Sequence, residues 1–283
     1  MTPLTLLDRI SQISHLRRVR EFNAAFHSRS DDVFIVSFPK SGTTWLQMIV
    51  YQILTDGDLS RIWHICEFSP FWEEDFVFGD LRIPARTSRG VFKSHLGYPF
   101  IYHGEGKYIY GVRNGKDVAI SFYHHLRNYN NFELGFDEFW QTFLTSGVGA
   151  FGRWFDHVSQ YADNPDNLNL LFVRYEDLAT DLKRTIQKIA RFLETELSDE
   201  DLERAVVKST FTYMKQHEEK FDLYHREVRK PGNAAVSGLR PNQFLRNGSS
   251  GEWKTVLNSD QIDQFGAMFE QQLGDKGFDQ YRS

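Results

Sequence analysis

The chain has 283 residues, of which 41% are hydrophobic and 25% charged, and its net charge is −5. This composition excludes a disordered chain, and the negative charge argues against nucleic-acid binding as the main function. The single cysteine, Cys66, excludes a disulfide framework and favours a cytoplasmic protein, and no apolar run approaches the ~18 residues of a membrane span. We expect one domain over residues 1–283 with one sizeable core.

Hydrophobic spacing predicts strands that alternate with helices along the chain. An amphipathic helix is expected within the first thirty residues, and Ser198 is expected to cap a helix. Strands are expected at 33–37, 91–94, 107–112 and 168–173, and further helices at 42–54, 115–127, 136–145, 150–162, 177–194 and 259–274. Residues 56–90 and 222–251 are expected to be irregular. The alternation predicts an α/β fold with a central parallel sheet flanked by helices, and ligands should bind beyond the carboxyl ends of its strands.

The block Phe-Pro-Lys-Ser-Gly-Thr-Thr-Trp at 38–45 follows the first expected strand and predicts a phosphate-binding loop. Amides at such a turn and in the first helical turn lack intrahelical partners and can face an anion. Lys40 adds a positive charge, Thr43 and Thr44 add hydroxyl donors, and Gly42 lets the backbone approach closely. The order differs from the loop G-x-x-x-x-G-K-[ST] of nucleoside triphosphatases, because Lys40 precedes the only glycine of the block.

Three later blocks extend this pattern: Lys93-Ser94-His95, the run RNGKDVAIS at 113–121, and the run RNGSSGEWK at 246–254. In this order the four blocks resemble the phosphosulfate loop, the Lys-Thr-His motif, the 3′-phosphate segment and the Arg-Lys-Gly-x-x-Gly-Asp-Trp-Lys loop of the cytosolic-type sulfotransferases. The resemblance covers about residues 30 to 260. It implies transfer of a sulfuryl group from 3′-phosphoadenosine 5′-phosphosulfate (PAPS) to a hydroxyl of a small-molecule acceptor, without a metal.

The resemblance implies a task for each matched residue. Lys40 and Lys93 would stabilise charge on the leaving phosphate and the sulfuryl group, and His95 would be the general base for the acceptor hydroxyl. Arg113 and Ser121 would clamp the 3′-phosphate. The residues expected to bind PAPS are Lys40, Ser41, Gly42, Thr43, Thr44, Trp45, Arg113, Ser121, Tyr175, Ser209, Phe211, Arg246, Asn247 and Gly248. For Trp45, Tyr175, Ser209 and Phe211, contact with the adenine and a plain core role both stay open.

The sequence departs from the family pattern in the last block. Asn247 stands where the family has lysine, which removes one positive charge over the 3′-phosphate, and Glu252 replaces aspartate. Residues 254–259 resemble the family's dimerisation segment only loosely, so a monomer and a homodimer both stay open.

The acceptor cannot be read from these motifs. By family position, the aromatic and acidic segment 63–76 borders the acceptor site, so its rings could grip an apolar acceptor while its acids stay solvated or meet a cationic group. An aromatic-packed loop is the alternative. Acceptor choice is expected in residues 63–90, 98–103, 129–149 and 222–245. The pair His64 with Cys66 is a weak metal signal, because it has no second pair at ligand spacing. The pair His124 with His125 is equally weak, because adjacent residues of a helix point apart.

The main alternative is a phosphotransferase that uses a nucleoside triphosphate. It requires a lysine after the glycine and a metal-holding carboxylate after a strand, and Asp177 is the single tempting candidate. A nucleotide-binding module without catalysis would leave Lys93 and His95 without a task.

Overall fold

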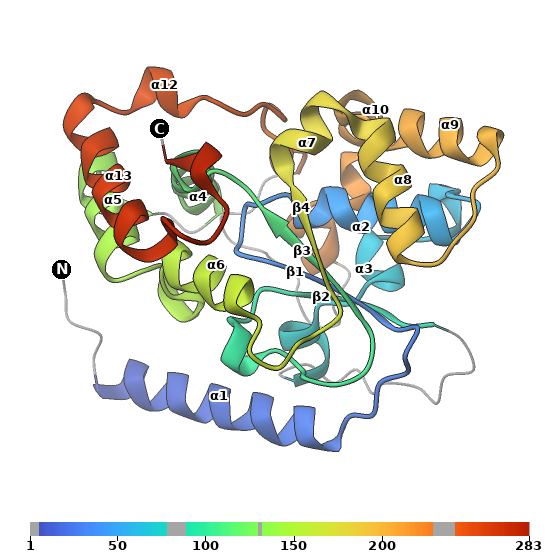
Figure 1. Ribbon diagram of the computed structural model, residues 1–283, viewed down its shortest axis with the longest axis horizontal. Helices are drawn as coiled ribbons and strands as arrows, with labels where there is room; N and C mark the ends of the chain where they lie inside the picture. The colour runs from blue at the N-terminus through green and yellow to red at the C-terminus, as the bar shows by residue number, and fades with distance from the viewer. Residues whose placement is uncertain (1–5, 78–88, 130–131, 229–240, 283) are drawn as a thin grey trace.

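A parallel sheet lies at the centre of the computed structural model, which describes residues 6–77, 89–129, 132–228 and 241–282 (Figure 1). Within these residues the strands are β1 (Val33–Ser37), β2 (Val91–Ser94), β3 (Lys107–Val112) and β4 (Leu170–Arg174), in the order β2-β1-β3-β4. All three pairings are parallel, and Val36 of β1 lies beside both Ser94 and Tyr110. The carboxyl ends of β1, β2 and β3 therefore meet at one edge. The predicted α/β class and parallel sheet are confirmed.

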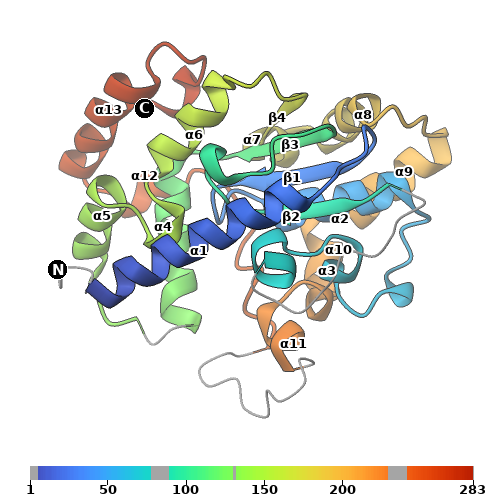
Figure 2. The same ribbon diagram turned by 90° about the horizontal axis from the view of Figure 1, so that it is seen from below.

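Helices cover both faces of the sheet (Figures 1 and 2). In Figure 1, α4, α5, α6 and α13 lie to the left of the strands, and α2, α8 and α9 lie to the right. The described helices are α1 (Leu6–Ala25), α2 (Thr43–Leu54), α3 (Ile65–Phe68), α4 (Gly115–Tyr129), α5 (Phe136–Thr145), α6 (Trp154–Asp163), α7 (Tyr175–Thr180), α8 (Leu182–Phe192), α9 (Asp199–Lys208), α10 (Phe211–Gln216), α11 (Leu223–Val228), α12 (Trp253–Val256) and α13 (Ser259–Leu273). None of these helices is both long and apolar enough to cross a bilayer.

Alternation along β1 divides the core into two clusters. Phe34 and Val36 join a strongly aromatic cluster that includes residues of α1, α5, α6 and α13. Val33 and Ile35 point the other way, into an aliphatic cluster with residues of α2, α8 and α9. Successive side chains of a strand point to opposite faces, so one short buried strand supports both helical layers.

The predicted helix at 177–194 is wrong as a single element, because the chain breaks it into α7 and α8. Asp181 has φ −145° and ψ 70°, and its side chain accepts a hydrogen bond from the Arg184 amide as the N-cap of α8. Ser198 caps α9 as predicted, accepting from the Asp201 amide. The helix predicted at 150–162 begins later, at Trp154, because Gly152 adopts φ +69° and interrupts the helical backbone.

The two segments predicted to be irregular contain short helical turns. Residues 56–90 include α3 and a π-helical segment, Trp72–Val77, and residues 222–251 begin with α11. The remaining parts of these segments at 78–88 and 229–240, and residues 130–131 of the expected acceptor loops, lie outside the described residues.

Candidate active site

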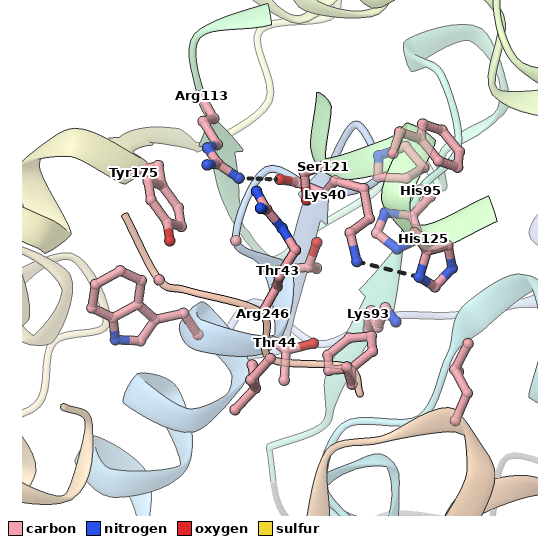
Figure 3. Close-up of a pocket in the computed structure, with 18 of the residues that line it drawn as sticks. Lys40, Thr43, Thr44, Lys93, His95, Arg113, Ser121, His125, Tyr175 and Arg246 are labelled. Carbon is pink, nitrogen blue, oxygen red and sulfur yellow. Dashed lines mark hydrogen bonds between the residues drawn. The ribbon is translucent and has the colours of Figure 1, made fainter. Parts of the chain in front are cut away.

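A pocket opens at the carboxyl ends of β1, β2 and β3 (Figure 3). The predicted site residues that line it are Lys40, Gly42, Thr43, Thr44, Trp45, Lys93, His95, Arg113, Ser121, Tyr175, Phe211, Arg246, Asn247 and Gly248. Ser41 and Ser209 do not line it. Both are buried, and neither side-chain hydroxyl has a hydrogen-bond partner. The structure thus gathers residues from four distant sequence blocks around one cavity.

The phosphate loop turns sharply between β1 and α2. Lys40 adopts φ +71° and Gly42 φ +94°, and a Cβ on Gly42 would lie 2.8 Å from the Tyr175 ring. Thr43 begins α2, and its Oγ1 lies 2.5 Å from Oγ of Ser37. No side chain caps the start of α2. Its first amides therefore remain available to an anion at the positive end of the helix.

The Lys40 ammonium lies inside the pocket rather than in bulk water. Nζ is 3.4 Å from Nδ1 of His125 and 4.8 Å from the centre of the Phe244 ring (Figure 3). Burial, and then the positive charges of Arg113 and other nearby cations, together lower the Lys40 pKa to about 7. Burial also lowers the His125 pKa, to about 2, so this imidazole is neutral and its Nδ1 accepts from Lys40. A bound anion would reverse the electrostatic part of the Lys40 shift.

Lys93 ends β2 on the other side of the cavity. Its Nζ lies 4.3 Å from the centre of the Phe71 ring, and burial lowers its pKa. Both active-site lysines thus carry their charge at an aromatic wall, where water screens it weakly. Such cations interact strongly with a phosphosulfate group that enters between them.

Hydrogen bonds to its backbone and to its ring hold His95 in place. Its amide donates to Oε1 of Glu73 at 2.6 Å, and Nε2 of His157 donates to its carbonyl at 3.3 Å. Ring Nδ1 lies 2.8 Å from the Ser37 carbonyl, which can only accept, so Nδ1 carries the hydrogen. Burial, and then the charge of Lys93, hold the His95 pKa well below its usual value. The ring is therefore neutral, with the lone pair on Nε2.

Arg113 ties the phosphate loop to the later loop at 246–253. Nη1 donates to the Lys40 carbonyl at 3.2 Å and Nη2 donates to the Ser249 carbonyl at 2.9 Å (Figure 3). The guanidinium lies 4.2 Å from the centre of the Tyr175 ring, and its buried Nε has no partner. Because Arg113 lines the cavity, that unsatisfied donor fits a polar ligand rich in acceptor oxygens.

Two carboxylates shape the later loop. Asp117, in the first turn of α4, accepts from the amides of Gly251 at 2.6 Å and Trp253 at 3.2 Å. Glu252 forms a bidentate ion pair with Arg246, with one contact at 2.7 Å. Asp117 was not among the predicted site residues, so its anchoring of this loop was missed.

Aromatic groups form a slot beside the phosphate loop. Trp45 donates from Nε1 to the Ser209 carbonyl at 2.7 Å, and its ring lies 5.3 Å from that of Tyr175 at an interplanar angle of 74°. Gly248 has φ +65°, and a Cβ there would lie 2.3 Å from the Phe211 ring. Glycine is therefore required at this position. Trp45, Tyr175 and Phe211 all line the cavity.

The rest of the cavity wall was not predicted as site residues. It consists of Pro39, Phe71, Glu74, Phe122, His125, Phe151, Met214, Leu223, Phe244 and Leu245. Leu223, Phe244 and Leu245 fall in the segment 222–245 that was expected to determine acceptor choice. The aromatic and acidic segment 63–76 divides in the structure, with Trp72 buried in the core and Phe71 and Glu74 in the cavity wall.

The weak metal signals resolve into structural hydrogen bonds. Nδ1 of His64 accepts from the Cys66 amide at 3.2 Å, and Nε2 lies 3.2 Å from the Asp222 carbonyl. Within the described stretches no three His, Cys, Asp or Glu side chains gather as a metal site. Asp177, the carboxylate of the phosphotransferase alternative, forms an ion pair with Arg174 at 2.6 Å.

Comparisons with known proteins agree with this geometry. The sulfotransferase domain family matches residues 30–277. An amine sulfotransferase of Oryctolagus cuniculus is 33% identical over 260 residues, covering 88% of this chain and 83% of the relative. Sulfotransferase 1B1 of Canis lupus familiaris is 31% identical over 271 residues, covering 88% of this chain and 85% of the relative. The chain therefore belongs to the sulfotransferase family.

Solved structures show the same fold. The mouse sulfotransferase SULT7A1, complexed with PAP (3′-phosphoadenosine 5′-phosphate), has a TM-score of 0.69 at 26% identity. The match covers 94% of this chain and 91% of the mouse chain. A retinol dehydratase complexed with retinol and PAP has a TM-score of 0.79 at 23% identity, with coverage of 94% and 87%.

Proposed function

We propose that this sulfotransferase moves the sulfuryl group of PAPS to a hydroxyl of a small-molecule acceptor, with His95 as the general base. The observation that carries the proposal is the state of the His95 ring. Nδ1–H donates to the Ser37 carbonyl, so Nε2 holds the lone pair. His95 lines the same cavity as Lys40 and Lys93. A neutral base that lines one cavity with two cations supports the proposal, because sulfuryl transfer to a hydroxyl uses a base and positive charge together.

The acceptor oxygen would attack sulfur while the bond between sulfur and the bridging phosphate oxygen breaks, and Nε2 of His95 would take the hydroxyl proton. The other product is 3′-phosphoadenosine 5′-phosphate (PAP). Lys40 would neutralise the charge that grows on the bridging oxygen, and Lys93 would hold the sulfuryl oxygens. Stabilisation of charge that appears only in the transition state raises the turnover rate. The low His95 pKa should rise when PAPS brings negative charge into the cavity, because that charge opposes the effect of Lys93.

The other assigned residues would bind the donor. The amides of residues 41–45, with Thr43 and Thr44, would hold the 5′-phosphate. Arg113, Ser121 and the loop at 246–248 would hold the 3′-phosphate, and the slot of Trp45, Tyr175 and Phe211 would hold the adenine. The PAP complex of the mouse relative supports this choice of donor. The phosphotransferase alternative is not favoured, since the family is that of sulfotransferases and Asp177 is already paired with Arg174.

Transfer of radioactive sulfate tests the proposal. The purified protein should move label from PAPS to members of a panel of phenols and alcohols, and it should move no label from γ-labelled ATP with Mg²⁺. Phosphate transfer from ATP, without sulfate transfer from PAPS, would overturn it. The cytoplasmic location, the single domain and the choice between monomer and homodimer stay predictions.

A further inference from the structure

One acidic side chain lines a cavity that is otherwise strongly basic. Lys40, Lys93, Arg113 and Arg246 line it, and Glu74 is the single carboxylate among the lining residues that the structure describes. The four cations suit an anionic donor. A carboxylate would repel that donor, so Glu74 is explained neither by phosphate binding nor by the sulfuryl transfer itself.

Glu74 is fixed in place by a buried arginine. Arg226 of α11 is 3% exposed, and it donates from Nη1 to Oε2 of Glu74 at 2.5 Å and from Nη2 to Oδ1 of Asp75 at 2.7 Å. Asp75 also accepts from the Phe71 amide at 2.7 Å through Oδ2. The cluster of Glu74, Asp75 and Arg226 therefore holds two carboxylates for one guanidinium. Burial lowers the pKa of Lys93, and the negative charge of Glu74 also reaches that lysine and opposes the shift.

The two carboxylates differ in exposure, and this difference shows which one faces the cavity. The Asp75 side chain is 12% exposed and that of Glu74 is 48% exposed. Asp75 alone can neutralise Arg226, and it also supports the local backbone. Glu74 lines the cavity and is half exposed, so an acceptor in the cavity can reach it. Neutralisation of Arg226 therefore does not account for Glu74.

The walls near Glu74 suit an aromatic or apolar acceptor body. Phe71 lies in the same π-helical region and Leu223 lies in α11, and both line the cavity with Met214 and Phe244. The Phe71 ring already carries Lys93 at 4.3 Å and Arg226 at 5.7 Å, so its face is not available to a further cation. A cationic group on the acceptor would instead meet the Glu74 carboxylate.

We propose that Glu74 selects acceptors that carry a protonated amine at the end remote from the reacting hydroxyl. This inference rests on the proposed function. The two groups must lie at opposite ends of the acceptor, because Lys40 and Lys93 at the reaction centre repel a cation and Glu74 attracts one. A phenol with an aminoalkyl chain has this arrangement, with an aromatic body between the two ends.

Tyramine and 4-propylphenol form a matched pair for the test, because they differ only in a terminal ammonium in place of a methyl group. The protein should sulfate tyramine with a kcat/KM about tenfold higher, the size of a charge-assisted contact that water partly screens. Nuclear magnetic resonance of the product should show sulfate on the phenolic oxygen. Equal values for the two phenols, or preference for 4-propylphenol, would overturn the inference.

The variant Glu74→Gln separates recognition from folding, because the amide oxygen can still accept from Arg226. It should lose about tenfold in kcat/KM for tyramine and stay within about threefold for 4-propylphenol. Glu138→Gln is the control, since Glu138 is exposed on α5 and does not line the cavity. It should keep the tyramine preference. Retention of that preference in Glu74→Gln would contradict the role of Glu74.

Calorimetry distinguishes failure of this inference from failure of the proposed function. If PAP binds, tyramine should bind the PAP complex about tenfold more tightly than 4-propylphenol, and Glu74→Gln should remove the difference. Equal binding of the two phenols to the PAP complex would overturn the inference and leave the donor assignment intact. Failure of PAP itself to bind would overturn the proposed function.

Discussion

The two ends of the cavity are built in different ways. At the donor end, Lys93 lies in β2, and the phosphate loop, His95 and Arg113 follow directly after strands of the same sheet, so their positions are set by its parallel register. At the acceptor end, Phe71, Glu74, Phe151, Leu223 and Phe244 come from separate loops and short helices. Donor binding therefore depends on the core of the fold, and acceptor choice depends on its connections. Connections can change in sequence without disturbing the sheet.

His95 lies where the two ends meet, and its replacement should give the largest effect. His95→Ala should lower kcat by about 10²- to 10⁴-fold, because no other group would take the acceptor proton, while PAP affinity stays nearly constant. Rapid-quench assays and calorimetry measure these two quantities. His27→Ala, at an exposed position, is the control. Full activity in His95→Ala would remove this residue from the mechanism.

Arg113 tests the donor end alone. Arg113→Ala should weaken PAP binding about ten- to a hundredfold, since charge-assisted hydrogen bonds are lost. It should also erase discrimination between PAP and adenosine 5′-monophosphate. Arg127→Ala is the control, because it removes an exposed arginine of α4, the helix that begins just after Arg113. It should change neither PAP affinity nor the discrimination between PAP and adenosine 5′-monophosphate. An unchanged affinity ratio in Arg113→Ala would show that the 3′-phosphate is bound elsewhere.

The pH dependence of donor binding tests Lys40. Its pKa is lowered to about 7 in the donor-free protein, and a bound phosphate raises it, so binding takes up a proton. PAP affinity should therefore fall from pH 7.5 to pH 9, by up to about tenfold per unit. Lys40→Arg stays protonated over this range and should give a flatter profile. Calorimetry in buffers of different ionisation enthalpy measures the proton uptake, and its absence in the unmodified protein would contradict the assignment.

The smallest effect is expected at Asn247, where this chain lacks the lysine of the family pattern. Asn247 lines the cavity beside Arg246 and Gly248. Asn247→Lys should tighten PAP binding by a few-fold, because a half-exposed positive charge adds about 1 kcal/mol or less. The tyramine preference should not change, since this position belongs to the donor end. A shift in acceptor preference would show that the two ends are coupled.

The donor end was predictable because its residues sit in short blocks beside strands that the hydrophobic pattern identifies. Lys40, His95 and Arg113 each follow a strand whose range the sequence predicted, and parallel strands bring their carboxyl ends together. At the acceptor end, the expected segments 63–90 and 222–245 do contribute lining residues such as Phe71 and Leu223, but their side-chain contacts were not predictable. Nothing near residue 74 in the sequence indicates that Arg226 pairs with Glu74, and the pair His124-His125 gives no sign that one ring contacts Lys40.

The break between α7 and α8 at Asp181 was also not predictable from the sequence pattern. The apolar stripe of 177–194 continues through this position, so periodicity predicts one helix. A capping side chain competes with the helical backbone, and Asp181 ends α7 and begins α8. Local hydrogen-bond competition of this sort does not appear in a hydrophobic pattern.

Binding of PAP to the purified protein tests the central claim most directly. Calorimetry should give saturable one-to-one binding of PAP, with adenosine 5′-monophosphate at least about tenfold weaker because Arg113 and the loop at 246–248 lose the 3′-phosphate. If PAP gives no measurable binding, or binds no better than adenosine 5′-monophosphate, the assignment of this cavity to the sulfuryl donor is wrong.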